Sequence, residues 1–334
     1  MKIIIPMAGR GSRLRPHTLT TPKPLVPIAG KPIVQRLVES LVQNLDEKVD
    51  EIAYIIGDFG KEVEAELKKI AEQMGAKGSI YYQDQPLGPA HAIHCAANSI
   101  SGHCLVAFSD TLFKSDFSFD TNNDGIIWTQ QVEDPSAYGV VKTNDEQIIT
   151  EFIEKPQEPV SNLAIVGIYY FRDGDQLRKE LAYLLDNDIR EKGEFQITTV
   201  LENMKNKGTQ FKAGEVEEWM DCGNKDAIVY TNQRTLDTEP VQDLSSVKAK
   251  IINSTIIPPC HIGNDVTIKN SVVGPYVSIG GNSTVDHCVI QNSVIQDDSH
   301  ISSAVMCDSM IGNHAHYSGN AKKLSLGDYS QLKD

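Results

Sequence analysis

The sequence has 334 residues, with 45 acidic side chains against 31 lysines and arginines and a formal net charge of −14 at pH 7. This length predicts two domains, because single hydrophobic cores seldom grow beyond about 250 residues. The acidity argues against nucleic acid or an anionic membrane as the main partner, since either requires an extended basic face.

The sequence predicts neither a membrane span nor export. No window approaches about 18 consecutive apolar residues. The run from Ile3 to Gly9 is too short for the apolar region of a signal peptide and lacks a small-residue cleavage pattern. The six cysteines are widely spaced without a CxxC pair, which is typical of reduced thiols. We therefore expect a cytoplasmic protein.

Strand-like and helix-like segments alternate from residue 1 to about 236. The opening run KIIIPMA is continuously apolar, as a strand covered on both faces should be. An amphipathic helix begins at Pro32, and Gly75 ends a second helix. Further strands are expected over 51–57, 79–83 and 104–110, with a helix from Pro89 to about Ser99. The alternation predicts an α/β domain over 1–236 with a doubly wound, mostly parallel, Rossmann-like sheet.

After residue 250 the helical pattern gives way to aliphatic residues six positions apart. They form triplets that start 16 or 17 residues apart: Ile256, Ile262 and Ile268; Val273, Ile279 and Val285; Val289, Ile295 and Ile301; Val305, Ile311 and Tyr317. One such residue on each side would fill the axis of a triangular β-helix. We predict a short left-handed parallel β-helix over 251–320, after a polar linker over 237–250 and before a C-terminal tail over 321–334.

The loop that follows the first strand, GRGSRLRPHTLTTPKPL over 9–25, concentrates positive charge in an acidic chain. Its glycines would let backbone N–H groups approach phosphate oxygens, and its arginines would add bidentate hydrogen bonds. Leu14 stands where the third glycine of a dinucleotide fingerprint belongs, and no P-loop run is present. Ligands of doubly wound sheets bind beyond the carboxyl ends of the strands, where this loop and Asp110 both fall.

The run Gly9-x-Gly11-Ser12-Arg13-Leu14, with Pro22-Lys23 ending ten residues beyond the arginine, resembles the signature of the sugar-nucleotide pyrophosphorylases. These enzymes are nucleotidyltransferases that act on sugar 1-phosphates. Ser12 replaces the usual threonine and keeps its hydroxyl. Similar segments continue in the family's order to about residue 235: QDQPLGPAHA, FSDT, YGVV, EKP, IVGIYYF, GEFQIT and WMDCG. YGVV, EKP, GEFQIT and the W-x-D-x-G run look most like the glucose-1-phosphate thymidylyltransferases.

The resemblance implies an Mg²⁺-dependent reaction of a nucleoside triphosphate with a sugar 1-phosphate, giving an NDP-sugar and pyrophosphate. The attacking phosphate is largely dianionic at neutral pH, with a second pKa near ~6, so no general base is required. Catalysis should then consist of positioning and charge neutralisation. By resemblance, the catalytic residues are Arg13, Lys23 and Asp110. Asp110 and Asp221 would hold Mg²⁺, which prefers one or two carboxylates together with phosphates and waters.

The resemblance also divides the remaining site residues between the two substrates. Gln83 would pair with the edge of a uracil or thymine, and Lys155 would neutralise the sugar phosphate while Glu154 and Glu194 bind sugar hydroxyls. Arg10 and Arg15 are left open between the site and the solvent. The implied nucleotide-binding residues are Ala8, Gly9, Gly11, Ser12, Arg13, Gln83 and Gly88. The implied sugar-phosphate residues are Gly139, Glu154, Lys155, Gly167 and Glu194.

Several alternatives remain open at this point. We favour dTTP or UTP with glucose 1-phosphate, but GTP with mannose 1-phosphate and UTP with N-acetylglucosamine 1-phosphate require the same chemistry. Hexapeptide β-helices also form acyltransferases, and five histidines are available for that role: His261, His287, His300, His314 and His316. We favour a β-helix that serves assembly of a homo-oligomer or regulation, because its apolar edges would otherwise be exposed. A regulatory subunit without catalysis is a third alternative, against which the intact set of charged residues argues.

Overall fold

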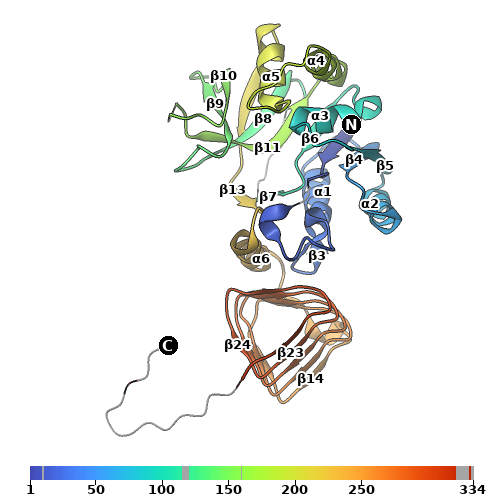
Figure 1. Cartoon of the computed structure of the whole chain (residues 1–334), viewed down its shortest axis with the longest axis vertical. Helices are drawn as coiled ribbons and strands as arrows, with labels where there is room; N and C mark the ends of the chain where they lie inside the picture. Colours follow the sequence, from blue (N-terminus) through green and yellow to red (C-terminus); the bar gives the residue numbers. More distant parts are fainter. Residues whose placement is uncertain (10, 115–119, 159, 321–330, 332–334) are drawn as a thin grey trace. The chain divides into compact units, whose positions relative to one another are not determined.

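The computed structural model describes residues 1–9, 11–114, 120–158, 160–320 and 331 (Figure 1). Contacts divide the chain into one unit of residues 1–26 and 31–223 and another of 27–30 and 224–334. This division differs from the predicted boundary at 236, because α6 (Lys225–Thr238) packs with the β-helix and with residues 27–30. The predicted linker holds the end of α6 and the short helix η4 (Leu244–Ser246). The predicted tail, apart from residue 331, lies outside the described residues.

A nine-stranded mixed sheet forms the centre of the first unit (Figure 1). Its parallel part runs in the order β5 (Lys77–Tyr82), β4 (Glu51–Ile56), β1 (Lys2–Pro6), β6 (Cys104–Ala107). The chain moves outward from β1 through β4 to β5 and then returns to the other side of β1. This reversal places the carboxyl ends of β1 and β6 side by side, which is where doubly wound sheets bind ligands.

The other half of the sheet is antiparallel, more so than the sequence predicts. It contains β8 (Gly125–Gln131), β9 (Gly139–Thr143), β10 (Ile149–Glu154) and β11 (Leu163–Phe171), and β11 joins it to β6. Short connections link these strands, whereas a parallel pair would require a crossover of a dozen residues or more. β12 (Phe211–Glu215) pairs in parallel with β8, after α4 (Gly174–Asp186) and α5 (Ile197–Asn206).

The remaining elements of the first unit agree with the sequence pattern. α1 (Ile33–Gln43) begins directly after Pro32 and buries one apolar face. α2 (Lys61–Gln73) ends just before Gly75, and α3 (Pro89–Cys95) continues as the 3₁₀ turn η3 (Ala97–Ser99). Two short ribbons are also present: β7 (Thr111–Lys114) with β13 (Glu218–Asp221) in this unit, and β2 (Pro27–Ile28) with β3 (Lys31–Pro32), of which β2 belongs by its contacts to the second unit. In the described part of the chain, no helix is long and apolar enough to cross a membrane.

The second unit contains the predicted parallel β-helix, whose three sheets surround one apolar axis (Figure 1). The first sheet contains β14 (Lys250–Ile252), β17 (Thr267–Lys269), β20 (Thr284–Asp286), β23 (His300–Ser302) and β26 (His316–Ser318). The second contains β15 (Thr255–Ile256), β18 (Val272–Val273), β21 (Val289–Ile290) and β24 (Val305–Met306). The third contains β16 (Cys260–Ile262), β19 (Val277–Ile279), β22 (Ser293–Ile295) and β25 (Met310–Ile311). The fold class is therefore confirmed.

The third and fourth predicted triplets are wrong in their first member. Ile290 is fully buried, whereas Val289 is 49% exposed and Val305 is 86% exposed. Val289 is paired with Val272 on the outer face, and Ile290 continues the inward row. The reason is a shorter corner: three residues (274–276) join β18 to β19, but only two (291–292) join β21 to β22. Counting back six residues from Ile295 therefore reaches Val289, which faces outward, and not Ile290, which faces the axis.

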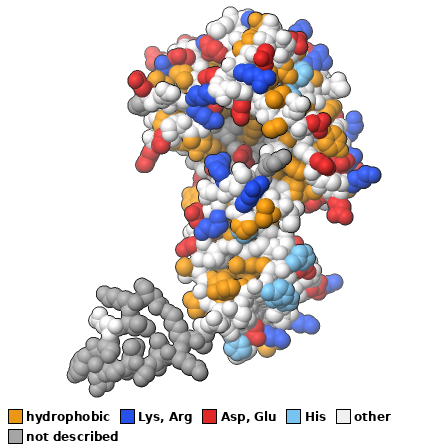
Figure 2. Space-filling model, in the orientation of Figure 1, with side chains coloured by type: hydrophobic (Ala, Val, Ile, Leu, Met, Phe, Trp, Pro, Cys, Tyr) orange, Lys and Arg blue, Asp and Glu red, His pale blue; other side chains and the backbone are white. Residues whose placement is uncertain are grey.

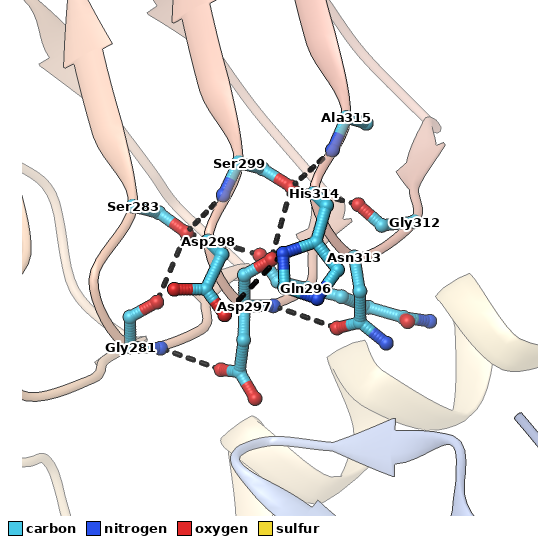
Figure 3. Close-up of polar contacts among 10 residues, drawn as sticks. All are labelled: Gly281, Ser283, Gln296, Asp297, Asp298, Ser299, Gly312, Asn313, His314 and Ala315. Carbon is cyan, nitrogen blue, oxygen red and sulfur yellow. Dashed lines mark hydrogen bonds and ion pairs between the residues drawn. The ribbon is translucent and has the colours of Figure 1, made fainter.

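Stacked polar side chains hold the corners of the β-helix together (Figure 3). Ser283 Oγ accepts a hydrogen bond from Ser299 N (3.1 Å), and Ser299 Oγ accepts one from Ala315 N (3.3 Å) in the following coil. Asp297 Oδ1 likewise accepts from Gly281 N (2.6 Å). The two serine bonds satisfy N–H groups in the interior of the stack that would otherwise lack partners, whereas the Asp297 bond lies at the surface. The repeated serines in the sequence therefore have a structural role between coils.

Candidate active site

A cavity of about 390 Å³ lies in the first unit, at the carboxyl ends of β1 and β6. Its walls come from the glycine-containing loop after β1, the turn η2 (Lys23–Leu25), the segment before α3, the residues after β6 and the GEFQIT segment. Arg10 lies outside the described residues, and Arg15 is exposed. The predicted residues that line this cavity are Ala8, Gly9, Gly11, Ser12, Arg13, Lys23, Gln83, Gly88, Asp110 and Glu194.

Gly11 fixes the shape of the loop that follows β1. Its φ of +59° is in the left-handed region, and a Cβ at this position would lie 2.8 Å from Lys23 Cβ. Thr18 Oγ1 donates a hydrogen bond to Gly11 O (2.7 Å), and the turn η1 (Ser12–Leu14) follows. The glycine is therefore required both by its conformation and by the close approach of Lys23.

Lys23 is a buried lysine that forms an ion pair with Asp110. Its side chain is only 9% exposed, and Nζ lies 2.9 Å from Asp110 Oδ2. Asp110 comes just after β6 and is 41% exposed at the cavity wall. A solvated surface lysine is excluded by this burial, and the ammonium group is fixed where an anionic substrate could meet it.

Asp221 lies beside Asp110 through the pairing of β13 with β7. Asp221 is opposite Thr111, and Cys222 N donates a hydrogen bond to Asp110 O (2.9 Å). Burial raises the pKa of Asp221, and the negative charge of Asp110 raises it further, while Lys23 and Arg13 oppose the shift. The two carboxylates thus repel each other across one small region.

The acidic pair fits the requirements of a magnesium ion. Carboxylate oxygens are the hard ligands that Mg²⁺ prefers, and Mg²⁺ commonly takes only one or two of them from the protein. Among the described residues, no group of three or more His, Cys, Asp or Glu side chains could hold a metal. A cation at Asp110 and Asp221 would therefore depend on substrate phosphates and water for its remaining ligands.

The far wall of the cavity is formed around Gln83 and Gly88. Gln83 Nε2 donates to Gly88 O (3.2 Å) and lies 3.0 Å from His91 Nδ1. Gly88 has a φ of +117°, and a Cβ there would lie 2.7 Å from both the N and the O of Phe195. This close approach brings Glu194, the neighbour of Phe195, to the cavity wall.

The predicted sugar-phosphate residues Gly139, Glu154 and Lys155 do not line this cavity. Glu154 Oε2 accepts a hydrogen bond from Thr198 Oγ1 (3.0 Å), and Lys155 Nζ lies 3.6 Å from Glu154 Oε1. A Cβ on Gly139 would lie 3.0 Å from Thr198 Cγ2 and 3.2 Å from Glu154 Oε2. These residues therefore form a separate polar cluster on the antiparallel strands, and their role in sugar binding stays a prediction.

Gly167 lies apart from this polar cluster and joins the two halves of the sheet. Its φ is +96°, and its carbonyl accepts a hydrogen bond from Phe108 N (2.9 Å) just beyond β6. The register between β8 and β11 is interrupted at this point. Gly167 therefore supports the segment that leads to Asp110, whereas the sequence predicts a direct backbone contact to the sugar.

Tyr138 is a site neighbour that the sequence did not predict. Burial raises the pKa of its phenol most, and the charge of Asp221 raises it further while Arg13 lowers it. Its ring packs edge to face with Trp219 at 4.9 Å. The YGVV segment contains it, but only the glycine of that segment carried a predicted role. Tyr138 does not line the cavity itself, and the unpredicted residues that do are mostly apolar and gave no chemical signal: Pro6, Met7, Pro24, Pro86, Pro89, Ala92, Phe108, Ser109 and Gly223.

Comparisons with known proteins show which chains this one resembles. Residues 2–238 match the family described as nucleotidyl transferase. The low-salt glycan biosynthesis nucleotidyltransferase Agl11 of Haloferax volcanii is 31% identical, with both chains covered in full. The glucose-1-phosphate thymidylyltransferase of Streptomyces antibioticus is 28% identical over 100% of this chain and 99% of that protein. A crystal structure from Bacillus anthracis, assigned as a glucose-1-phosphate thymidylyltransferase in complex with a sucrose, matches with a TM-score of 0.60 at 25% identity, covering 72% of this chain and 97% of that chain.

Proposed function

The chain belongs to the nucleotidyl transferase family, and we propose that it transfers a nucleoside monophosphate from dTTP or UTP to glucose 1-phosphate with the help of Mg²⁺. The products would be an NDP-sugar and pyrophosphate. The observation that carries this proposal is the convergence of the glycine loop, Lys23 and Asp110 on one cavity. The full-length similarity to a thymidylyltransferase supports the choice of nucleotide and sugar.

The proposed reaction is an in-line displacement at the α-phosphorus. An oxygen of the sugar phosphate forms the new P–O bond, and the bond from the α-phosphorus to the oxygen bridging the α- and β-phosphates breaks. The electron pair and the negative charge leave with pyrophosphate. Because the nucleophile is already an anion, no residue has to remove a proton from it. The main barrier is the approach of one anion to another.

Lys23 and Arg13 would lower this barrier by neutralising charge. Lys23 is preorganised, because its hydrogen bond to Asp110 and its burial restrict the long side chain. Arg13 is exposed at the cavity wall and can reach phosphate oxygens with its guanidinium group. The backbone N–H groups of Ala8, Gly9, Gly11 and Ser12 would receive the triphosphate, since the glycines keep side chains out of the way.

Asp110 and Asp221 would hold the metal, and Glu154, Lys155 and Glu194 would bind the sugar phosphate. When bound, Mg²⁺ neutralises phosphate charge and aligns the phosphate oxygens. Burial and, to a smaller extent, the negative charge of Asp110 raise the pKa of Asp221, and a bound cation would relieve the repulsion between the two carboxylates. Lys155 is 48% exposed, so its ammonium group is accessible to a phosphate.

A matrix of nucleoside triphosphates against sugar 1-phosphates, with pyrophosphate release as the readout, tests the proposal. We expect the highest kcat/KM with dTTP or UTP and glucose 1-phosphate. Preference for GTP with mannose 1-phosphate, or UTP with N-acetylglucosamine 1-phosphate, would change the substrate but keep the reaction. No pyrophosphate from any pair would contradict the proposed function and favour a regulatory subunit without catalysis.

The β-helix gives a second activity to test. Histidines are exposed on its surface (Figure 2), and His314 Nδ1 lies 3.6 Å from Asp298 Oδ2 (Figure 3). An assay with acetyl-CoA and a hexosamine 1-phosphate tests for acyl transfer, which we do not expect.

We propose instead that the β-helix supports a homo-oligomer, because Val289 and Val305 expose apolar surface on adjacent strands. Analytical ultracentrifugation of the full chain tests this, since a monomer would contradict it.

A further inference from the structure

We infer that Asn232, a side chain of the β-helix unit, is a positioning residue that sets the place of Lys23. It would act by holding residues 27–30, which follow Lys23 in the chain but belong by their contacts to the second unit. The inference rests on the proposed function, because it gives Lys23 the charge-neutralising role described above.

Asn232 is completely buried on α6 and joins three segments of the second unit. Its Oδ1 accepts hydrogen bonds from Ala29 N (3.0 Å) and from Ser278 Oγ (2.7 Å). Its Nδ2 donates to Tyr276 O (3.4 Å). Ser278 and Tyr276 belong to β19 and its preceding corner, so one amide connects the β-helix with the backbone of residue 29.

A second contact holds the same segment. Gly30 has a φ of +80°, and a Cβ at this position would lie 2.1 Å from His261 Nε2. The chain therefore passes directly against the imidazole ring of β16. Ile28 and Ala29 are also buried. Residues 27–30 are thus fixed by both a hydrogen bond to α6 and close packing on the β-helix.

The connection from this segment back to Lys23 is short and stiff. Val26 N donates a hydrogen bond to Lys23 O (3.1 Å), which closes the turn η2. Pro24 and Pro27 restrict the backbone between Lys23 and Ala29. A displacement of Ala29 therefore cannot be absorbed easily before it reaches Lys23. Misplacement of a catalytic group by about 1 Å can lower a rate by about 100-fold.

The first test replaces Asn232 in the full-length chain. Asn232→Ala removes the acceptor of Ala29 N, and we expect kcat for pyrophosphate release to fall by about 10-fold or more, with less change in the KM of the sugar phosphate. Ser293→Ala is the matched control: Ser293 is equally buried in the β-helix and bonds Gln291 O (2.7 Å) and Ser309 N (3.1 Å). We expect the control to lower the Tm but to leave kcat within about twofold.

Two measurements separate positioning from a general loss of stability. In a Lys23→Ala background, Asn232→Ala should cause little further loss of kcat, because both changes act through the same group. Amide hydrogen exchange without substrate should show faster exchange at Ala29 and Val26 in Asn232→Ala but not in Ser293→Ala. Gly30→Ala is the second variant, to be used if Asn232→Ala folds poorly. Its methyl group would push residues 27–30 away from His261, and we expect the same changes in exchange and kcat.

The outcomes are distinguishable from a failure of the proposed function. If the unmodified chain releases no pyrophosphate from any substrate pair, the proposed function fails, whatever the exchange data show. If the chain is active but Asn232→Ala and Gly30→Ala keep the kcat of the Ser293→Ala control, the positioning role is overturned. Additive losses in the Lys23→Ala background would also overturn it, because they indicate independent action.

Discussion

Lys23 and Asp110, which are 87 positions apart in the chain, meet with Nζ 2.9 Å from Oδ2 at the wall of the cavity. The pair brings together the glycine loop after β1 and the end of β6. It also places a fixed cation within the electrostatic reach of Asp221, whose raised pKa Lys23 partly counteracts. The acidic metal-binding candidates and the basic phosphate-binding candidates are therefore one connected group of charges.

Lys23→Met should remove catalysis while retaining the shape of the side chain. The substitution removes the cation that we propose neutralises phosphate, and it leaves Asp110 and Asp221 with less positive charge nearby. We expect kcat to fall by about 10²–10³, the usual loss for a group that stabilises transition-state charge. Steady-state kinetics of pyrophosphate release measure it. Lys61→Met, at the exposed start of α2, is the control and should retain normal activity.

Asp110→Asn should abolish Mg²⁺-dependent release of pyrophosphate. The amide retains the size of the side chain but loses the charge that a divalent cation requires. We expect the activity to fall by about 10²-fold or more and the Mg²⁺ concentration for half-maximal activity to rise. Chelation should stop the unmodified enzyme, and added Mg²⁺ should restore it. Asp145→Asn, in an exposed turn, is the control; full activity of Asp110→Asn would show that the metal site is elsewhere.

Gly11→Ala should both destabilise the protein and weaken binding of the triphosphate. The left-handed φ and the 2.8 Å approach to Lys23 Cβ leave no room for a methyl group. We expect a loss of more than about 1 kcal/mol in the free energy of unfolding and a higher KM for the nucleotide. Gly9→Ala serves as the stability control, because, chain neighbours aside, no heavy atom of the described residues lies within 4 Å of the place that its methyl group would occupy. Equal Tm values for the two variants would contradict this account.

Ser271→Ala should weaken the β-helix without changing the active site. Ser271 Oγ accepts a hydrogen bond from Cys288 N (3.0 Å) and donates one to Lys269 O (2.5 Å). Its removal leaves a buried N–H group unpaired, which costs about 1–3 kcal/mol. Urea unfolding measures the loss, and Ser318→Ala on the exposed strand β26 is the control. A free energy of unfolding equal to that of the control would show that the serine stack contributes little.

The grouping of the candidate phosphate-binding residues around one cavity could be predicted because the signals are local. Gly11, Arg13 and Lys23 occur at fixed spacing directly after a buried strand, and Asp110 follows another strand. The topology of a doubly wound sheet then brings the strand ends together. The glycine conformation, the positive charges and the positions after the strands all indicate the same cavity. The prediction of these residues therefore did not require knowledge of distant contacts.

The remaining features depend on contacts that a local pattern does not contain. Glu154 and Thr198 meet although 44 positions separate them. In the sequence, nothing distinguishes Asn232 from other polar residues of a helix. Only the fold shows that it is buried and accepts a hydrogen bond from Ala29 N. The shorter corner after Ile290 could not be predicted either. Val289 and Ile290 are both aliphatic, so the sequence pattern does not show which of them faces the axis.

The assignment of residues 27–30 to the β-helix unit has a consequence for how such enzymes can evolve. Ile28 and Ala29 are made early in synthesis, yet their partners on α6 and the β-helix are encoded about 200 codons later. A gene fragment that starts at residue 224 would therefore encode a β-helix with one of its own pieces missing. Recombination that replaces this C-terminal unit would therefore also replace the partners of residues 27–30, including the side chain that accepts the hydrogen bond of Ala29 N.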